Sequence, residues 1–122
     1  MANRIARPAL RRRRARVGEE KKMSFQERVD SWLLQCFGEK IAKDKIERNH
    51  RFLEEALELV QSLGCTKSEA YQLVDYVFGR TIGKPIQEVG GVMVTLAALC
   101  LANEMEMNEA GEAEAWPVTS IT

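Results

Sequence analysis

The sequence has little of what many sites and anchors need: one histidine, three widely spaced cysteines and no long apolar run in 122 residues. With His50 alone, a histidine-based metal cluster cannot be built without a partner chain. No C-x-x-C pair or disulfide framework is present, so Cys36, Cys65 and Cys100 are expected to be buried, reduced thiols. No uninterrupted apolar stretch approaches the roughly 18 residues of a membrane span. These absences favour a cytoplasmic protein outside the membrane.

The net charge of zero hides an uneven distribution along the chain. Residues 1–22 carry nine Lys or Arg and two Glu, a net charge of +7. The remaining hundred residues carry nine basic and sixteen acidic side chains, a net charge of −7. An acidic body argues against a nucleic-acid backbone as partner. It favours a metal ion, or a small ligand that arrives with a counter-cation.

Residues 1–22 are expected to be a disordered basic extension, because they lack apolar periodicity and Pro8 and Gly18 interrupt any helix. Three interpretations stay open: a nucleic-acid or nuclear-localisation arm at Arg11–Arg14, a transit peptide, or a segment without function that precedes a start at Met23. A secretory signal is excluded, because no apolar segment follows the arginines.

The rest of the chain carries helical periodicity and no strand pattern. The helices are expected over about 24–41, 44–63, 66–79 and 86–105, with a short fifth that Asn108 caps and the Trp116–Pro117 pair ends. Residues 23–114 are predicted to be one all-α domain, a bundle of four to five helices, and residues 115–122 an irregular tail. Helix 86–105 is apolar on more than one face, which is typical of a bundle centre or a subunit interface.

Local signals mark several ends of these helices. Ser24 with Glu27, and Thr66 with Glu69, form capping-box patterns, and Gly64 stands at a C-terminal cap.

Three carboxylates gather on the second predicted helix. Glu54 and Glu58 are four residues apart and Glu55 and Glu58 three apart, so they project from neighbouring positions. Like charges at this spacing repel, and a hard divalent cation would offset the repulsion. The alternative is an ordinary solvated acidic face.

One further acid, Glu88, stands at the head of the apolar fourth helix. If the second and fourth helices pack antiparallel, Glu88 faces Glu55 and Glu58, and facing carboxylates of this kind build metal sites in bundles. The ion would be Mg²⁺, with Mn²⁺ as an alternative.

A divalent ion in this site would bind substrate phosphates and activate a water molecule. A carboxylate that does not bind the metal, such as Glu54, could take a proton from that water. In the loop before the fourth helix, Arg80 and Lys84 could contact phosphate oxygens, or be ordinary solvated cations.

These motifs resemble the MazG-like superfamily over about residues 25–114. The resemblance rests on E-E-x-x-E at Glu54–Glu58, on E-x-G-x-V at Glu88–Val92, and on an apolar helix that ends LANEMEM-N-E-A. It implies an all-α nucleoside triphosphate pyrophosphohydrolase that forms dimers or tetramers and hydrolyses a nucleoside triphosphate to the monophosphate and pyrophosphate with magnesium. By this resemblance Glu55, Glu58 and Glu88 match metal ligands, and Glu54 matches the leading acid of the first motif.

The chain departs from the family pattern at Gly91, where the second motif, E-x-x-D, has its aspartate. The spacer of 29 residues between Glu58 and Glu88 is also long, because it holds a whole helix with Asp75 as a substitute candidate. A second interpretation is therefore a weakened or inactive bundle that binds nucleotides or a protein partner.

Overall fold

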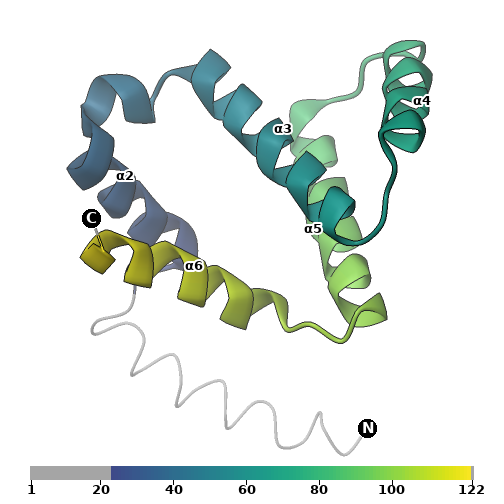
Figure 1. Cartoon of the computed structure of the whole chain (residues 1–122). Helices are drawn as coiled ribbons and strands as arrows, with labels where there is room; N and C mark the ends of the chain where they lie inside the picture. Colours follow the sequence, from purple (N-terminus) through teal and green to yellow (C-terminus); the bar gives the residue numbers. More distant parts are fainter. Residues whose placement is uncertain (1–22, 122) are drawn as a thin grey trace, which may run out of the picture. The chain divides into compact units, whose positions relative to one another are not determined.

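The computed structural model describes the backbone of residues 23–121 and the side chains of residues 23–115. This part of the chain is all-helical and contains no strand, which confirms the predicted all-α class. Its five helices, drawn in Figure 1, are α2 (Phe25–Ala42), α3 (Lys45–Ser62), α4 (Lys67–Phe78), α5 (Pro85–Ala102) and α6 (Met107–Ile121). The predicted basic extension 1–22 lies outside the described residues.

The chain divides into two compact units, Met1–Ala42 and Lys43–Thr122. Helix α2 belongs to the first unit and α3 to α6 belong to the second. The boundary falls within the range 23–114, so the joining of α2 with α3–α6 in one domain stays a prediction.

Helix α2 begins at the predicted capping box. The Ser24 amide donates to Glu27 Oε1 at 2.8 Å, and the Glu27 amide donates to Ser24 Oγ at 3.0 Å. The helical pattern predicts an unbroken helix to Ile41, but Gly38 has φ 80° and ψ 167°, a conformation that glycine adopts without steric cost. The helix is therefore kinked at Gly38.

Helix α3 is defined by caps at both ends. The Asp44 carboxylate accepts from the Glu47 amide at 3.0 Å. At the other end Gly64 has φ 99°, and the Cys65 amide donates to the Val60 carbonyl at 2.9 Å, as in a Schellman motif. The C-terminal cap predicted at Gly64 is confirmed.

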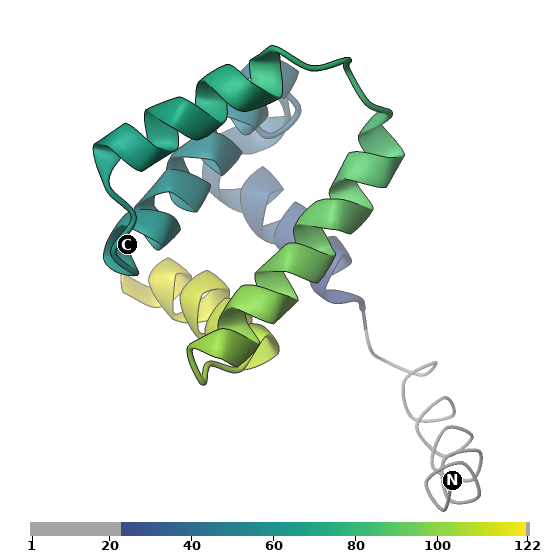
Figure 2. The same cartoon turned by 90° about the vertical axis from the view of Figure 1, so that its right-hand side faces the viewer.

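Helices α4 and α5 are joined by the segment 79–84, which Figure 2 shows at the top of the view. The Thr66–Glu69 capping box is present, with the Glu69 carboxylate 2.8 Å from the Thr66 amide. Pro85 occupies the first turn of α5, where its missing amide hydrogen costs no helical hydrogen bond.

Helix α6 differs from the expectation in its cap and its length. It begins at Met107, and the Glu106 carboxylate accepts from the Glu109 amide at 2.7 Å, so Glu106 rather than Asn108 caps it. Its backbone continues to Ile121 through the Trp116–Pro117 pair that was expected to end it. A proline removes one backbone donor and can kink a helix without ending it.

The apolar faces find little cover within residues 23–115. Cys100 is the one residue of this range that is buried, at 8% exposed, whereas Phe78 and Ile82 are 84% and 94% exposed. Among the described helices, α5 and α6, which follow each other in the chain, are the pair most in contact. The expected burial of apolar side chains on α3, such as Leu53 and Leu57, is therefore not seen, because the helix that would cover them does not pack along α3.

The three cysteines are free, in agreement with the absence of a disulfide framework. Cys100 is buried and Cys65 is half-buried, but Cys36 is exposed, so the expectation of burial is wrong for Cys36. Cys36 lies on α2, in the unit 1–42, where no other helix is described that could cover it.

One described helix, α5, is long and apolar enough to cross a membrane by length and composition. Glu88 is its one charged residue. The core helix of a soluble protein has the same length and composition, so the expected location outside a membrane stays a prediction.

Candidate functional site

Helix α3 carries two groups of opposite charge along its length. Its first half holds Lys45, Arg48 and Arg51, and its second half holds the three predicted carboxylates, Glu54, Glu55 and Glu58. The sequence placed these carboxylates on one helix within about one turn, and the structure confirms this placement.

Glu54 is part of an ion-pair network centred on Arg51. The Arg51 Nη1 group donates to Glu54 Oε1 at 2.7 Å, and the Arg51 Nε group donates to Glu47 Oε2 at 2.7 Å. The hydrogen bond and charge of Arg51 lower the pKa of Glu47, and Glu47 in turn raises the pKa of Arg51. The predicted catalytic carboxylate thus has a cationic partner one turn earlier, which the sequence analysis did not identify.

Glu55 and Glu58 have different surroundings from Glu54. Both are exposed, and neither makes a hydrogen bond or an ion pair within residues 23–115. Their oxygens are therefore available to a ligand from solution.

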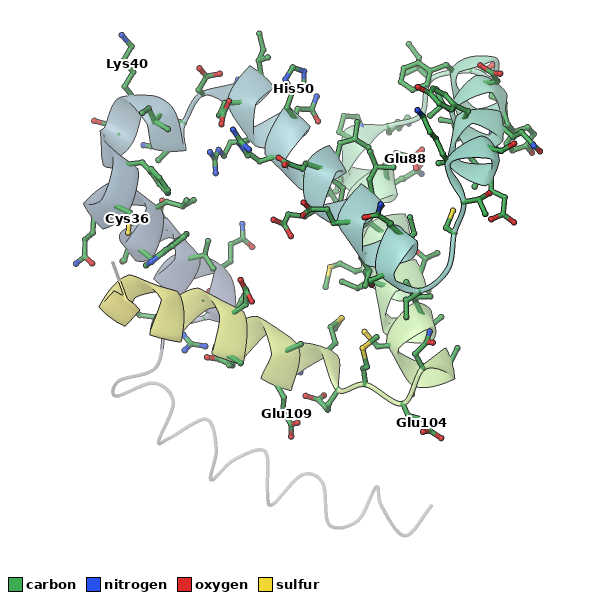
Figure 3. All side chains as sticks on the ribbon, in the orientation of Figure 1. Cys36, Lys40, His50, Glu88, Glu104 and Glu109 are labelled. Carbon is green, nitrogen blue, oxygen red and sulfur yellow. The ribbon has the colours of Figure 1, made fainter. Side chains whose placement is uncertain are left out.

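Glu88, labelled in Figure 3, lies in the first turn of α5, a different helix from the one that carries Glu55 and Glu58. Its carboxylate folds back over Gly83 in the preceding loop. A Cβ built on Gly83 would overlap Glu88 Oε2, and would lie 3.1 Å from its Cδ. Gly83 therefore leaves the space that this carboxylate occupies, a positioning role that only the loop geometry reveals.

The predicted metal ligands do not form one cluster within the described chain. Among residues 23–115, no three Asp, Glu, His or Cys side chains lie close enough to hold an ion. The antiparallel packing of α3 on α5 that would bring Glu88 to Glu55 and Glu58 is absent. The metal role of these three residues stays a prediction.

Gly91, where the family pattern has an aspartate, lies in the helical part of α5. A Cβ built on it meets no atom within 4 Å, so a larger side chain fits at this position.

Arg80 and Lys84 lie before α5, as predicted. The Arg80 guanidinium carbon is 4.3 Å from the centre of the Tyr76 ring, a cation–π geometry, and Nη1 lies 3.4 Å from the Tyr76 hydroxyl oxygen. Lys84 is the N-cap residue of α5, and its side chain makes no capping hydrogen bond. Their predicted contact with phosphate stays a prediction.

A cavity of about 550 Å³ lies at the start of α3, and the sequence analysis did not find it. It is open, and its lining residues are Lys43, Lys45, Arg48, Asn49 and Phe52. The last four follow the spacing i, i+3, i+4, i+7 and therefore share one helix face. This combination of basic, amide and aromatic side chains on one helix face is the sequence feature from which the cavity could have been predicted.

Comparison with known proteins gives no match. No family model, curated protein or solved structure matches this chain.

The Arg51 network predicts a specific pH dependence. The pKa of Glu47 lies below its ordinary value of 4.5, so its ion pair contributes stability above that value and is lost as the pH falls through the lowered pKa. We expect Arg51→Gln to raise the pKa of Glu47 toward its ordinary value. The loss of unfolding free energy between about pH 5 and about pH 3 should then become shallower. Carboxyl NMR titration and urea unfolding at each pH measure the two effects.

The matched control is Arg48→Gln. The Arg48 Nη2 atom lies 3.9 Å from Glu47 Oε2, whereas the Arg51 Nε atom lies 2.7 Å from the same oxygen. Arg48→Gln should shift the Glu47 pKa less than Arg51→Gln does. An equal shift in both variants would contradict the network.

Proposed function

We propose that the chain is a magnesium-dependent nucleoside triphosphate pyrophosphohydrolase of the MazG-like, all-α type. The observation that carries the proposal is the pair Glu55 and Glu58, two exposed carboxylates one turn apart without a protein partner in residues 23–115. Their mutual repulsion is relieved by a divalent cation, and carboxylate oxygens are the ligands that magnesium prefers. The order of the acidic motifs and the apolar α5 helix also support the proposal.

The donor set fits a hard cation, because Glu55, Glu58 and Glu88 offer only carboxylate oxygens. Magnesium, when bound, supplies charge neutralisation at the phosphates and a more acidic water. Manganese has the same preference for oxygen ligands and is the alternative ion.

Each remaining residue has a role in the proposed hydrolysis. Glu54 takes one proton from the attacking water, after its carboxylate separates from Arg51. The water oxygen bonds to the α-phosphorus, and the bond from the α-phosphorus to the oxygen that bridges the α- and β-phosphates breaks. Pyrophosphate leaves with that bridging oxygen. Arg80 and Lys84 contact the phosphate oxygens and hold the substrate.

The proposal requires Glu88 to approach Glu55 and Glu58, which lie on another helix. Helix α5 would supply Glu88 either by closing onto α3 of its own chain or from a second copy. The apolar side chains of α5 that are exposed, among them Val89, Met93 and Leu101, support a homodimer or homotetramer. A closed helical bundle, a cytoplasmic location and the absence of membrane or nucleic-acid partners belong to the same proposal.

A second candidate is a catalytically weakened or inactive bundle that binds nucleotides or a protein partner. Gly91 favours it, because glycine offers no ligand at the position of the family aspartate.

The enzyme proposal predicts pyrophosphate release from one or more nucleoside triphosphates in the presence of Mg²⁺ or Mn²⁺. We expect Glu58→Gln to lower kcat/KM by at least ~100-fold, because a lost metal ligand costs more than the ~10- to 100-fold of a lost supporting residue. Glu114→Gln is the matched control, since it removes one exposed carboxylate on α6. A panel of canonical and modified nucleotides, assayed for pyrophosphate, measures both. If no nucleotide in the panel is turned over, the proposed enzymatic function is wrong.

A second experiment concerns the missing aspartate. We expect Gly91→Asp to tighten Mn²⁺ binding about tenfold, because an added carboxylate increases the ligand charge of the site. The substitution fits, since nothing lies within 4 Å of a Cβ at this position. Gly91→Ala is the control, because it changes the helix propensity without adding a ligand. Calorimetric affinities that are equal in the two variants would show that position 91 does not face the ion.

A further inference from the structure

The cavity at the start of α3 is lined by three cationic residues, whose aliphatic stems, together with Phe52, make most of its surface apolar. Lys43, Lys45 and Arg48 supply three positive charges, and no acidic residue lines the cavity. Asn49 adds an amide, and Phe52 adds an aromatic wall one turn further along the helix. The volume of about 550 Å³ lies within the range of small-molecule pockets, roughly 300 to 1,000 Å³.

Arg48 is the member of this lining that most clearly lacks an acceptor. Its side chain is two-thirds shielded, at 34% exposed, and its Nε atom is buried without a hydrogen-bond partner in the described structure. Its nearest carboxylate oxygen is Glu47 Oε2, at 3.9 Å from Nη2. At 3.9 Å this ion pair is beyond hydrogen-bond distance, so Glu47 accepts no hydrogen bond from Arg48.

A buried donor without a partner is destabilising, and an absent ion or water is one explanation for such a group. A guanidinium presents its donors in a planar fork that matches two oxygens of a phosphate. Lysine ammonium groups bind phosphate as point charges. The lining therefore fits an anionic oxygen group, and its three cations match the higher charge of a phosphate better than that of a single carboxylate.

Phe52 narrows the class of ligand further. An exposed aromatic ring next to a phosphate-binding group is a surface on which a nucleobase can stack. The ring is 56% exposed, so a base can reach its face. A nucleotide brings both the phosphate and the base.

We propose that this cavity, which we call the α3 basic pocket (Lys43, Lys45, Arg48, Asn49 and Phe52), binds a nucleotide through its phosphate groups, with Arg48 as the principal contact. The choice of a nucleotide over another phosphate compound rests in part on the proposed function. Glu55 lies seven residues after Arg48, about 10 Å along the helix axis. A triphosphate held in the pocket therefore has the predicted metal carboxylates within its neighbourhood, and the pocket is a substrate-positioning site for the proposed hydrolysis.

The experiment is a titration of the full chain, labelled with ¹⁵N, with inorganic tripolyphosphate and separately with ATP, in EDTA and without divalent metal. The dissociation constant is measured from the chemical-shift changes of the backbone amides at positions 49 and 52. Phosphate bound to the N-terminal arginines therefore does not contribute to the measured value. We expect saturable shifts with both ligands and tighter binding of ATP, because only ATP has a base. Phe52→Leu should remove the preference for ATP.

Arg48→Gln should raise the dissociation constants of both ligands about tenfold, because it removes a charged hydrogen bond to phosphate. The matched control, Arg51→Gln, removes the same charge one turn later, outside the lining, and should change the affinity less than threefold. Lys45→Gln is a second pocket variant in case Arg48→Gln loses helix by circular dichroism, and it should also weaken binding. Absence of shifts at Asn49 and Phe52, or equal weakening by Arg48→Gln and Arg51→Gln, would overturn the proposal.

The results also separate this pocket from the proposed catalysis. Binding that depends on Arg48 without turnover of any nucleotide would keep the pocket and reject the enzyme. Turnover that depends on Glu58, with phosphate binding unaffected by Arg48→Gln and Lys45→Gln, would keep the enzyme and reject the pocket.

Discussion

Burial of apolar surface is the constraint on which this structure depends. A domain of about 100 residues is stable by only about 5–15 kcal/mol, and most of the favourable energy comes from apolar groups removed from water. Within residues 23–115, Cys100 is the one buried residue, while Phe78 and Ile82 are almost fully exposed. The helices are set locally by caps such as those at Thr66 and Gly64, but their apolar faces need further cover. Association between copies, or closure within the chain, would supply it.

The same constraint governs the candidate site. Glu55 and Glu58 are positioned by α3 alone, so their spacing does not depend on how the helices pack. Glu88 is fixed to α5 and to the space over Gly83, so its distance from α3 depends on packing. A complete carboxylate site therefore needs the same contacts that would cover the apolar faces. By contrast, the α3 basic pocket lies on one helix and its leading segment. It can bind phosphate before the carboxylate site is complete.

Features encoded by neighbouring residues could be predicted from the sequence. The all-α class, both capping boxes and the Gly64 cap follow from residues within one turn, and all are confirmed. The kink at Gly38 and the cap at Glu106 were missed, because either residue is also compatible with an ordinary helical position. At the site, the three carboxylates of α3 were found by spacing. The Arg51 ion pairs and the shielded Nε of Arg48 depend on side-chain conformations, which spacing does not determine.

The central proposal is that a second copy, rather than closure within the chain, covers the apolar faces of α3, α4 and α5 and supplies the contacts that the carboxylate site needs. The most direct test is thermal unfolding of the full chain over a hundredfold range of concentration, together with its mass by sedimentation equilibrium. The account predicts a dimer or tetramer whose Tm rises with protein concentration, because dissociation accompanies unfolding. A monomer at every concentration, with a cooperative transition whose Tm does not change, would contradict it.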